Sequence, residues 1–314
     1  MFSVILPVYN GAKFIENAIE SVFNQTYGDW EMVIVNDGSK DNTSEILDKY
    51  NSDSRIKIIH QENGGVSLAR NNGISASSGE YFVFLDADDV WHTNHLEVMK
   101  NLIDKYPDAG LYGTFTRTEL VNGGTIEECD FFAGKGEDIY LDDFLGEYYK
   151  DKSAKMFTVI TTCFSRKALD VCGLFPVGCA ICEDLELSLR VSAYFPVALS
   201  KIPTATYKKV NSTATKDISF DPDWRFFETV NQLYCDERIV EVKKANLKRV
   251  MQWFTMRRAR HYAIDGRKKE AFRAYKSIGD EPELKKDKFI TLLLLIMPVF
   301  VVRKLFEIRW RSKA

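Results

Sequence analysis

The chain has 314 residues, 45% of them hydrophobic, and a formal net charge of -3. This length suffices for one full hydrophobic core and a smaller second unit, and the composition excludes a disordered or collagen-like chain. The charge is unevenly distributed, because residues 243–314 contain 20 Lys and Arg against 7 Asp and Glu, a net of +13. The C-terminal region is therefore expected to meet an acidic partner.

Four segments near the start of the chain are rich in apolar residues and predict strands, at residues 2–8, 30–36, 55–60 and 81–85. Segments of helical periodicity follow the first three of them, and we expect Asn10 to cap the first of these helices. Strands that alternate with helices indicate a layered α/β protein with a parallel sheet. No G-x-G-x-x-G follows the first strand, so a dinucleotide-binding fold is not supported. The apolar start lacks a basic leader and is interpreted as a strand rather than a signal peptide.

The fourth strand leads directly into a cluster of carboxylates formed by Asp86, Asp88 and Asp89. Like charges this close repel one another, so a cation or a strong set of donors is expected to hold them. Ligands of open α/β sheets bind beyond the carboxyl ends of the strands, where Asp-x-Asp offers oxygen ligands to a hard divalent cation. The sequence thus predicts a metal–diphosphate site that uses Mg²⁺ or Mn²⁺; the alternative is a solvated acidic turn.

The remaining elements alternate less regularly. Helices are predicted over residues 93–106 and 183–194, and strands over residues 111–120, 155–164 and 197–210, with Ser165 capping a short helix. From Asp223 onward the pattern is helical throughout. Only one C-x-x-C occurs, Cys179 with Cys182, and no second pair follows at metal-ligand spacing. Free thiols in a reducing cytoplasm are therefore favoured over a zinc site.

Residues 289–302 (FITLLLLIMPVFVV) form an uncharged segment with Lys and Arg on both sides. As a helix it spans about 21 Å, less than the hydrocarbon layer of about 30 Å, and Pro298 interrupts it. We expect it to lie on the anionic inner face of the cell membrane, which would make the protein cytoplasmic and peripherally attached. A buried terminal helix or a dimer contact is the alternative. Nucleic acid is not an expected partner, because no recognition motif accompanies the positive charge.

Four blocks in sequence resemble family 2 glycosyltransferases with the GT-A fold and cover most of residues 2–192. These blocks are SVILPVYNGAKFIENAIESVFNQTY, VIVNDGSKDNTSEIL, NGGVSLARNNGISASSGEYFVFLDADDVW and CGLFPVGCAICEDLELSLR. The resemblance implies a three-layer α/β sandwich with a mostly parallel sheet in residues 1–215. Residues 216–314 would then form a helical, basic region that associates with the membrane.

The resemblance also implies roles in holding a nucleotide sugar. Pro7 and Tyr9 stand where the family packs the nucleobase. Asp37 matches the carboxylate that accepts a hydrogen bond from the base, which favours a uridine donor; its alternative role is that of a turn residue. Arg70 matches the arginine that braces the acidic cluster or the diphosphate.

Further matches concern the acidic residues. Asp86 and Ala87 resemble the segment that contacts the donor, Asp88 the metal ligand, and Asp89 a residue that orients its neighbours. Trp91 either walls the sugar pocket or packs the next helix onto the core.

On the acceptor side, Asp184 matches the general base, with Glu183 beside it. The alternative for this pair is a favourable helix N-terminal charge. Lys208 and Lys209 stand where some relatives carry a metal-binding histidine.

Together these matches imply an inverting, metal-dependent enzyme that moves one sugar from a nucleoside-diphosphate donor to a hydroxyl of a glycan or lipid-linked acceptor in cell-surface glycan assembly. The Q-x-x-R-W block of the longer polymerising members is missing after Glu183 and Asp184, which favours transfer of a single sugar. Two alternatives remain. One is a membrane-tethered nucleotide-sugar-binding protein without turnover. The other is a nucleotidyltransferase, which would carry a Gly-rich phosphate loop where this chain has LPVYNG.

Overall fold

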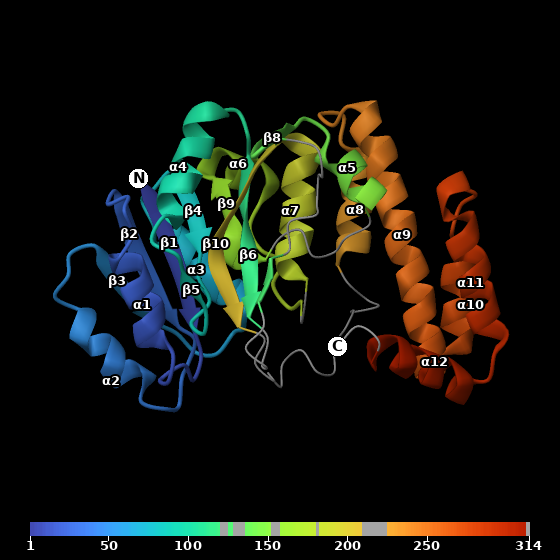
Figure 1. Ribbon diagram of the computed structural model, residues 1–314, viewed down its shortest axis with the longest axis horizontal. Coiled ribbons are helices and arrows are strands. Elements are labelled where there is room, and N and C mark those ends of the chain that lie inside the picture. The colour runs from blue at the N-terminus through green and yellow to red at the C-terminus, as the bar shows by residue number, and fades with distance from the viewer. Residues whose placement is uncertain (120–124, 128–135, 152–157, 180–181, 209–224, 312–314) are drawn as a thin grey trace.

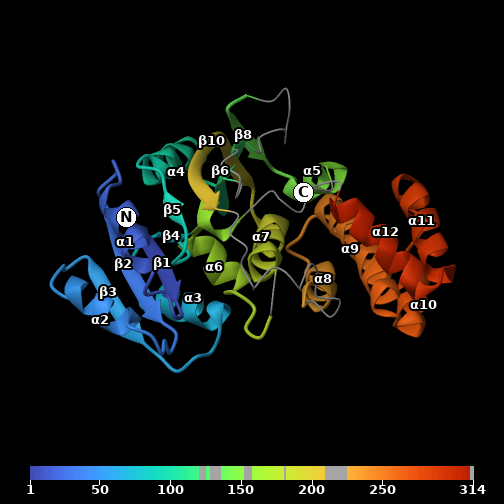
Figure 2. The same ribbon diagram turned by 60° about the horizontal axis from the view of Figure 1, so that its bottom comes forward.

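The computed structural model describes residues 1–119, 125–127, 136–151, 158–179, 182–208 and 225–311. Within this part of the chain one mixed sheet of ten strands has the order β3-β2-β1-β4-β9-β6-β10-β5, while β7 pairs with β6 and β8 with β10. Helices flank the sheet, and α8 to α12 extend to one side of it (Figure 1, Figure 2). The strands are β1 (Phe2–Val8), β2 (Trp30–Asn36), β3 (Ile56–His60), β4 (Tyr81–Phe84), β5 (Val90–Trp91), β6 (Leu111–Glu119), β7 (Thr125–Glu127), β8 (Asp138–Leu141), β9 (Thr162–Ser165) and β10 (Val197–Lys208).

The described helices follow the strands in alternation and then form the C-terminal region. They are α1 (Ile15–Phe23), α2 (Thr43–Leu47), α3 (Val66–Ser75), α4 (His95–Lys105), α5 (Phe144–Asp151), α6 (Arg166–Cys172), α7 (Glu183–Tyr194), α8 (Phe226–Cys235), α9 (Glu241–Asp265), α10 (Lys268–Lys276), α11 (Lys285–Ile296) and α12 (Val299–Arg311). Short 3-10 turns occupy Asp48–Tyr50, Val159–Thr161 and Pro282–Leu284.

Strand β1 lies at the centre of the parallel part of the sheet. It pairs in parallel with β2 on one side and with β4 on the other, and β2 pairs in parallel with β3. Every residue of β1 is buried, because both faces of the sheet are covered. The carboxyl ends of β1, β2 and β4 therefore meet at one edge. Strand β9 runs antiparallel to β4 and β6, and β6 runs parallel to β10, so six of the ten described strands share one direction. The predicted α/β class with a mostly parallel sheet is confirmed.

Two local predictions differ from the structure. The strand expected over residues 155–164 is confined to Thr162–Ser165, because Val159–Thr161 form a 3-10 turn and residues 155–157 lie outside the described part. Asn10 does not cap α1, which begins at Ile15. It has a left-handed backbone (φ 53°), and its side-chain oxygen accepts a hydrogen bond from the Lys40 N–H at 2.8 Å. The predicted cap at Ser165 is confirmed, since its Oγ accepts from the Ala168 N–H.

The main hydrophobic core continues from the sheet into the C-terminal helices. Phe226 of α8 and Leu247 and Phe254 of α9 belong to the same buried cluster as β1. The end of α9 contributes to a second, smaller cluster with α10 and α11. The predicted boundary between residues 215 and 216 lies outside the described residues, so the division into two domains stays a prediction.

Candidate functional site

Two loops at the carboxyl edge of the sheet are tied to each other by backbone-to-side-chain hydrogen bonds. The Gly11 N–H donates to Thr43 Oγ1 at 3.0 Å, and the Ala12 N–H donates to Asp41 Oδ2 at 3.1 Å. Pro7 is buried within β1, whereas Tyr9, two residues later, is 53% exposed. These hydrogen bonds fix the two loops relative to each other, and the Tyr9 side chain next to them is exposed to solvent.

Asp37 follows β2 and organises the loop between β3 and α3. Its buried carboxylate accepts hydrogen bonds from Gln61 Nε2 and the Gly64 N–H, both at 2.8 Å, and from the Gly65 N–H at 2.9 Å. The Asn63 side chain closes the same loop by donating to the Asp37 carbonyl oxygen at 3.0 Å. Hydrogen bonds to a charged group contribute about 1.5–3 kcal/mol each, so this carboxylate fixes the loop shape. The sequence alone gave no sign of these partners of Asp37.

Arg70 of α3 joins the acidic cluster after β4 to the start of α7. Its side chain donates from Nη2 to Asp86 Oδ1 at 2.8 Å and from Nη1 to Glu183 Oε1 at 2.7 Å. The residue is 2% exposed, and its guanidinium lies 5.4 Å from the centre of the Phe175 ring. Burial acts to lower the pKa of Arg70, but the two carboxylates outweigh it and raise that pKa. A single buried cation thus brings together residues that are far apart in the sequence.

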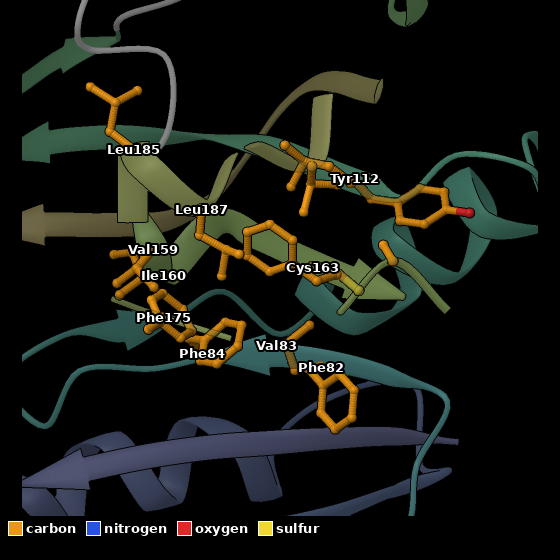
Figure 3. Close-up of a cluster of buried hydrophobic side chains, with 14 of the residues drawn as sticks. Phe82, Val83, Phe84, Tyr112, Val159, Ile160, Cys163, Phe175, Leu185 and Leu187 are labelled. Carbon is orange, nitrogen blue, oxygen red and sulfur yellow. The ribbon is translucent and has the colours of Figure 1, made fainter. Parts of the chain in front are cut away.

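Phe175 packs the segment before α7 against the core beneath the site. It meets Phe84 of β4 with ring centres 5.1 Å apart at 81°, in the cluster that Figure 3 shows. The Asn71 side chain makes two hydrogen bonds to the Phe175 backbone. It donates to the Phe175 carbonyl and accepts from the Phe175 N–H, each at 2.9 Å. The sequence did not reveal this clamp, because an asparagine beside Arg70 carries no signal of a partner 104 residues away.

Asp88 and Asp89, which follow Asp86, both have raised pKa values. Asp88 is exposed, yet neighbouring atoms remove part of its hydration, and this loss together with the Asp86 charge raises its pKa. Burial and the charges of Asp86 and Asp88 raise the pKa of Asp89 to about 8. This cluster abuts the loop after β1, because a side chain at Gly11 would lie 3.5 Å from the Ala87 Cβ and 2.5 Å from a methyl carbon of Val8. The acids are held close together at an energetic cost that a bound cation would relieve.

Asp184 lies in the first turn of α7, next to the Glu183 that Arg70 holds. Its Oδ1 accepts from the Leu185 N–H at 2.7 Å. Burial and the adjacent Glu183 charge raise the pKa of Asp184 above the ordinary carboxyl range, and the Arg70 cation opposes this shift. The residue before the pair, Cys182, has a left-handed backbone with φ 63°.

Trp91 is buried and connects β5 to α4. Its ring stacks on His95 with centres 4.1 Å apart, and its Nε1–H donates to the Ile160 carbonyl at 2.7 Å. Of the two roles expected for Trp91, these contacts fit the packing of the next helix onto the core. Lys208 is the last residue of β10, and Lys209 lies outside the described residues.

The described residues contain no group of three or more His, Cys, Asp and Glu side chains placed to hold a metal ion. A cation at the acidic cluster would take carboxylate oxygens from Asp88 and Asp86, while diphosphate and water would complete its coordination. This donor set suits a hard cation such as Mg²⁺ or Mn²⁺. The thiols of Cys163, Cys172, Cys179 and Cys235 are free, and Cys129 lies outside the described residues.

Known proteins resemble this chain in sequence over part of its length. Glycosyltransferase GlyG of Streptococcus pneumoniae is 32% identical over 145 residues, which are 46% of each chain. The Escherichia coli enzyme WfgD, named UDP-Glc:alpha-D-GlcNAc-diphosphoundecaprenol beta-1,3-glucosyltransferase, is 37% identical over 127 residues, 40% of this chain and 49% of that one. The chain thus spans less than half the length of the curated relatives it matches.

Solved structures resemble almost the whole chain. Staphylococcus aureus TarS 1-349 in complex with UDP-GlcNAc has a TM-score of 0.73 at 19% identity, covering 98% of this chain and 91% of that one. The mannosyltransferase PcManGT from Pyrobaculum calidifontis, in complex with GDP-Man and Mn²⁺, has a TM-score of 0.58 at 18% identity, covering 96% and 83%. At these identities the likeness establishes the fold, which is of the GT-A type.

The family described as Glycosyl transferase family 2 matches residues 3–171, more than half of the chain. The match includes Asp37, Arg70 and the acidic cluster after β4, and it ends before Glu183 and Asp184. The chain belongs to glycosyl transferase family 2.

Proposed function

We propose that this enzyme transfers a single sugar, with inversion, from a uridine diphosphate donor to a hydroxyl group of a lipid-linked acceptor in cell-surface glycan assembly. The observation that carries the proposal is the Arg70 bridge, which holds Asp86 at 2.8 Å and Glu183 at 2.7 Å. It supports a shared site for the acids after β4 and the acids of α7. The uridine donor is favoured because TarS is solved with UDP-GlcNAc and WfgD is named for UDP-Glc. The name of WfgD also supports a diphosphate lipid as the acceptor.

On the donor side, the departing diphosphate gathers negative charge. A divalent cation on Asp88 and Asp86 would stabilise that charge when bound. Pro7, Tyr9 and the loop fixed by Asp37 would position the nucleoside at the adjoining edge of the sheet. Arg70 would keep Asp86 in place, since the bidentate fork of a buried arginine holds carboxylates in a fixed geometry.

On the acceptor side, Asp184 would remove the proton of the attacking hydroxyl. Its pKa is raised by burial and by Glu183, and a base with a pKa closer to neutrality is the stronger proton acceptor. One base opposite one leaving group produces direct displacement and therefore inversion at the anomeric carbon.

The test is the Asp184→Asn variant, assayed with UDP-sugars and a prenyl diphosphate sugar acceptor in the presence of Mn²⁺. We expect turnover to fall about 10²–10⁴-fold, the usual contribution of a positioned base. The thermal shift caused by UDP should stay close to that of the wild type, because the donor side is unchanged. Chelation of the metal should abolish wild-type turnover. Near-wild-type transfer by Asp184→Asn would overturn the assignment.

We also propose that the joint between α11 and α12 rests on an anionic membrane. Ile296 and Phe300, on either side of Pro298, are 63% and 73% exposed. The Lys268 ammonium donates to the Met297 carbonyl at 3.1 Å and so places a cation beside these apolar side chains. No helix in the described part of the chain has the length and apolar character that crossing a bilayer requires. Exposed apolar side chains with cations around them favour binding in the plane of the membrane.

A basic hollow on α10 also supports membrane binding by this region. It has a volume of about 550 Å³ and is lined by Lys268, Lys269, Phe272, Arg273 and Lys276. Cations near an anionic surface contribute about 1 kcal/mol each to binding. This arrangement would hold the enzyme where lipid-linked acceptors occur.

A further inference from the structure

Helices α5 and α9, from outside the parallel part of the sheet, both pack against α7, whose first turn carries Asp184, and they pack extensively against each other. In Figure 1, α5 and the upper half of α9 lie side by side next to α7. Successive residues of a helix point about 100° apart. Because Glu183 is directed to Arg70 on the donor side, the Asp184 side chain emerges at a different angle.

Helix α5 presents the hydroxyl group of Tyr148. Tyr148 is fully buried, and its Oη has no hydrogen-bond partner within the part of the chain that the structure describes. Leaving a buried hydroxyl without a partner is unfavourable, so such groups usually mark a bound molecule or water. Burial raises the pKa of Tyr148, and the nearby charges of Cys182 and Asp184 raise it further while Arg257 opposes them. The helix that carries this hydroxyl packs against α7, the helix of the proposed base.

Helix α9 presents a cation and an aromatic ring next to that hydroxyl. The Trp253 ring meets the Tyr148 ring edge-on, with centres 6.0 Å apart at 75°. The Arg257 guanidinium lies 5.2 Å from the centre of the Trp253 ring. Arg257 is half-buried, and burial lowers its pKa although Tyr148 and Cys182 act in the opposite direction. A cation that has lost part of its hydration attracts an anion more strongly than an exposed one does.

We infer that Tyr148 and Arg257 form the acceptor subsite and that the acceptor carries a phosphate group near its reacting hydroxyl. The inference rests on the proposed function and deepens it. Tyr148 Oη donates a hydrogen bond to the acceptor, and Arg257 binds a phosphate oxygen as a charge-assisted partner. The Trp253 ring supports the guanidinium from behind. The same chemistry is offered by a lipid-linked sugar diphosphate and by a soluble polyol phosphate.

The inference is tested with three acceptors in parallel: a short-chain prenyl diphosphate GlcNAc, a glycerol phosphate oligomer and the neutral octyl glycoside of GlcNAc. The wild type is expected to use a phosphate-bearing acceptor with a KM at least about tenfold below that of the neutral one. The phosphate-bearing acceptor with the lower KM shows whether the natural acceptor is lipid-linked or a soluble polyol phosphate. Equal KM values for the neutral and the phosphate-bearing acceptors would overturn the phosphate assignment.

Substitutions at Arg257 and Tyr148 locate the subsite. Arg257→Gln is expected to raise the KM for the phosphate-bearing acceptor at least about tenfold, and Arg257→Lys to restore part of the loss. Tyr148→Phe is expected to raise the same KM without lowering Tm, because it removes a hydroxyl that has no protein partner. Arg249→Gln is the matched control, since it removes one charge from an exposed position of the same helix. Its KM should stay within about twofold of the wild type.

Acceptor binding measured by calorimetry separates this inference from the proposed function. If UDP does not bind and no donor is consumed, the proposed function is wrong. The affinities of Arg257→Gln and Arg249→Gln for the prenyl diphosphate GlcNAc still test the subsite in that case. Equal affinities or equal KM values for these two variants would overturn the inference.

Discussion

Arg70 illustrates how one buried side chain organises this site. Taking a guanidinium out of water is costly, and the cost is offset only when carboxylates lie in good geometry. Asp86 and Glu183 meet that condition at 2.8 and 2.7 Å. Removing either carboxylate would leave buried charge without a full set of partners, which is more damaging than losing an exposed ion pair. The bridge therefore couples the order of the acidic cluster to the position of α7.

Asp184 provides a prediction about pH and stability. Its folded-state pKa is raised, so the native protein holds that proton more tightly than the unfolded chain does. This stabilisation is complete below the unfolded pKa and is lost as pH rises through the raised value. At pH 8 the folded protein therefore contains a partly buried anion that Asp184→Asn lacks. We expect Asp184→Asn to be more stable than the wild type by about 1 kcal/mol at pH 8.

The measurement is the difference in Tm between Asp184→Asn and the wild type at pH 8 and at pH 4. The difference should shrink at the lower pH, where the folded-state carboxyl is largely protonated and the unfolded-state carboxyl is about half protonated. A difference that is independent of pH would show that the substitution acts through packing instead. The variant that loses turnover is thus expected to gain stability, as often holds for residues kept for chemistry.

At the scale of single elements, the loop between β3 and α3 depends on Asp37. Asp37→Ala removes three hydrogen bonds to a charged acceptor, and we expect it to destabilise the protein by more than about 3 kcal/mol and to weaken UDP binding. Gln61→Ala removes only one of the three donors and should cost about 1.5 kcal/mol. Urea unfolding and UDP titration of both variants provide the measurement. Equal, small effects would mean that the loop holds its shape without the carboxylate.

The elements differ in how far they follow from the sequence. Strands β1 to β4 were predictable because apolar residues dominate each of them, with Glu31 in β2 and Lys57 in β3 as the charged exceptions, and because each ends at polar or turn residues. The run over residues 155–164 looked similar, yet only Thr162–Ser165 pair with neighbours, since pairing depends on the partners β4 and β6. Local pattern cannot distinguish a strand from a 3-10 turn when tertiary contacts decide between them.

The candidate site was predictable in its residue types but not in its connections. The acids after β4 and those of α7 follow from the resemblance to a family. The partners of Asp37 and the Asn71 clamp on Phe175 do not, because a hydrogen bond between distant segments leaves no local signal. Trp91 had two possible roles, and its stacking on His95 depends on how α4 packs, which the sequence does not encode locally.

At the scale of the whole molecule, the C-terminal helices predict membrane binding. The wild type should sediment with vesicles that contain anionic phospholipid and less so with neutral vesicles, and raised salt should release it because exposed charges are screened. The double variant Ile296→Asp, Phe300→Asp should lose most of this binding. Each CH₂ group that is buried on binding contributes about 0.8 kcal/mol to the binding free energy, and the two large side chains contribute several times as much.

The matched control for this test is Val240→Asp, Val242→Asp at the other end of α9. These valines are 58% and 59% exposed, so the control adds the same charge without touching the joint. It should bind anionic vesicles as the wild type does. Equal loss of binding in both double variants would indicate a general charge effect, and no vesicle binding by the wild type would refute the membrane proposal.

Helix α9 connects the main core to the C-terminal helices. It is a single helix of 25 residues, about 38 Å long, anchored in the main core by Leu247 and Phe254 and joined to α12 at its far end, where Arg303 donates to the Ile264 carbonyl at 2.9 Å. A rigid helix keeps the distance between its two ends constant. If its far end rests on a bilayer, Asp184 lies at a fixed distance from the membrane surface. The enzyme would then select acceptors by the distance of their hydroxyl group from that surface.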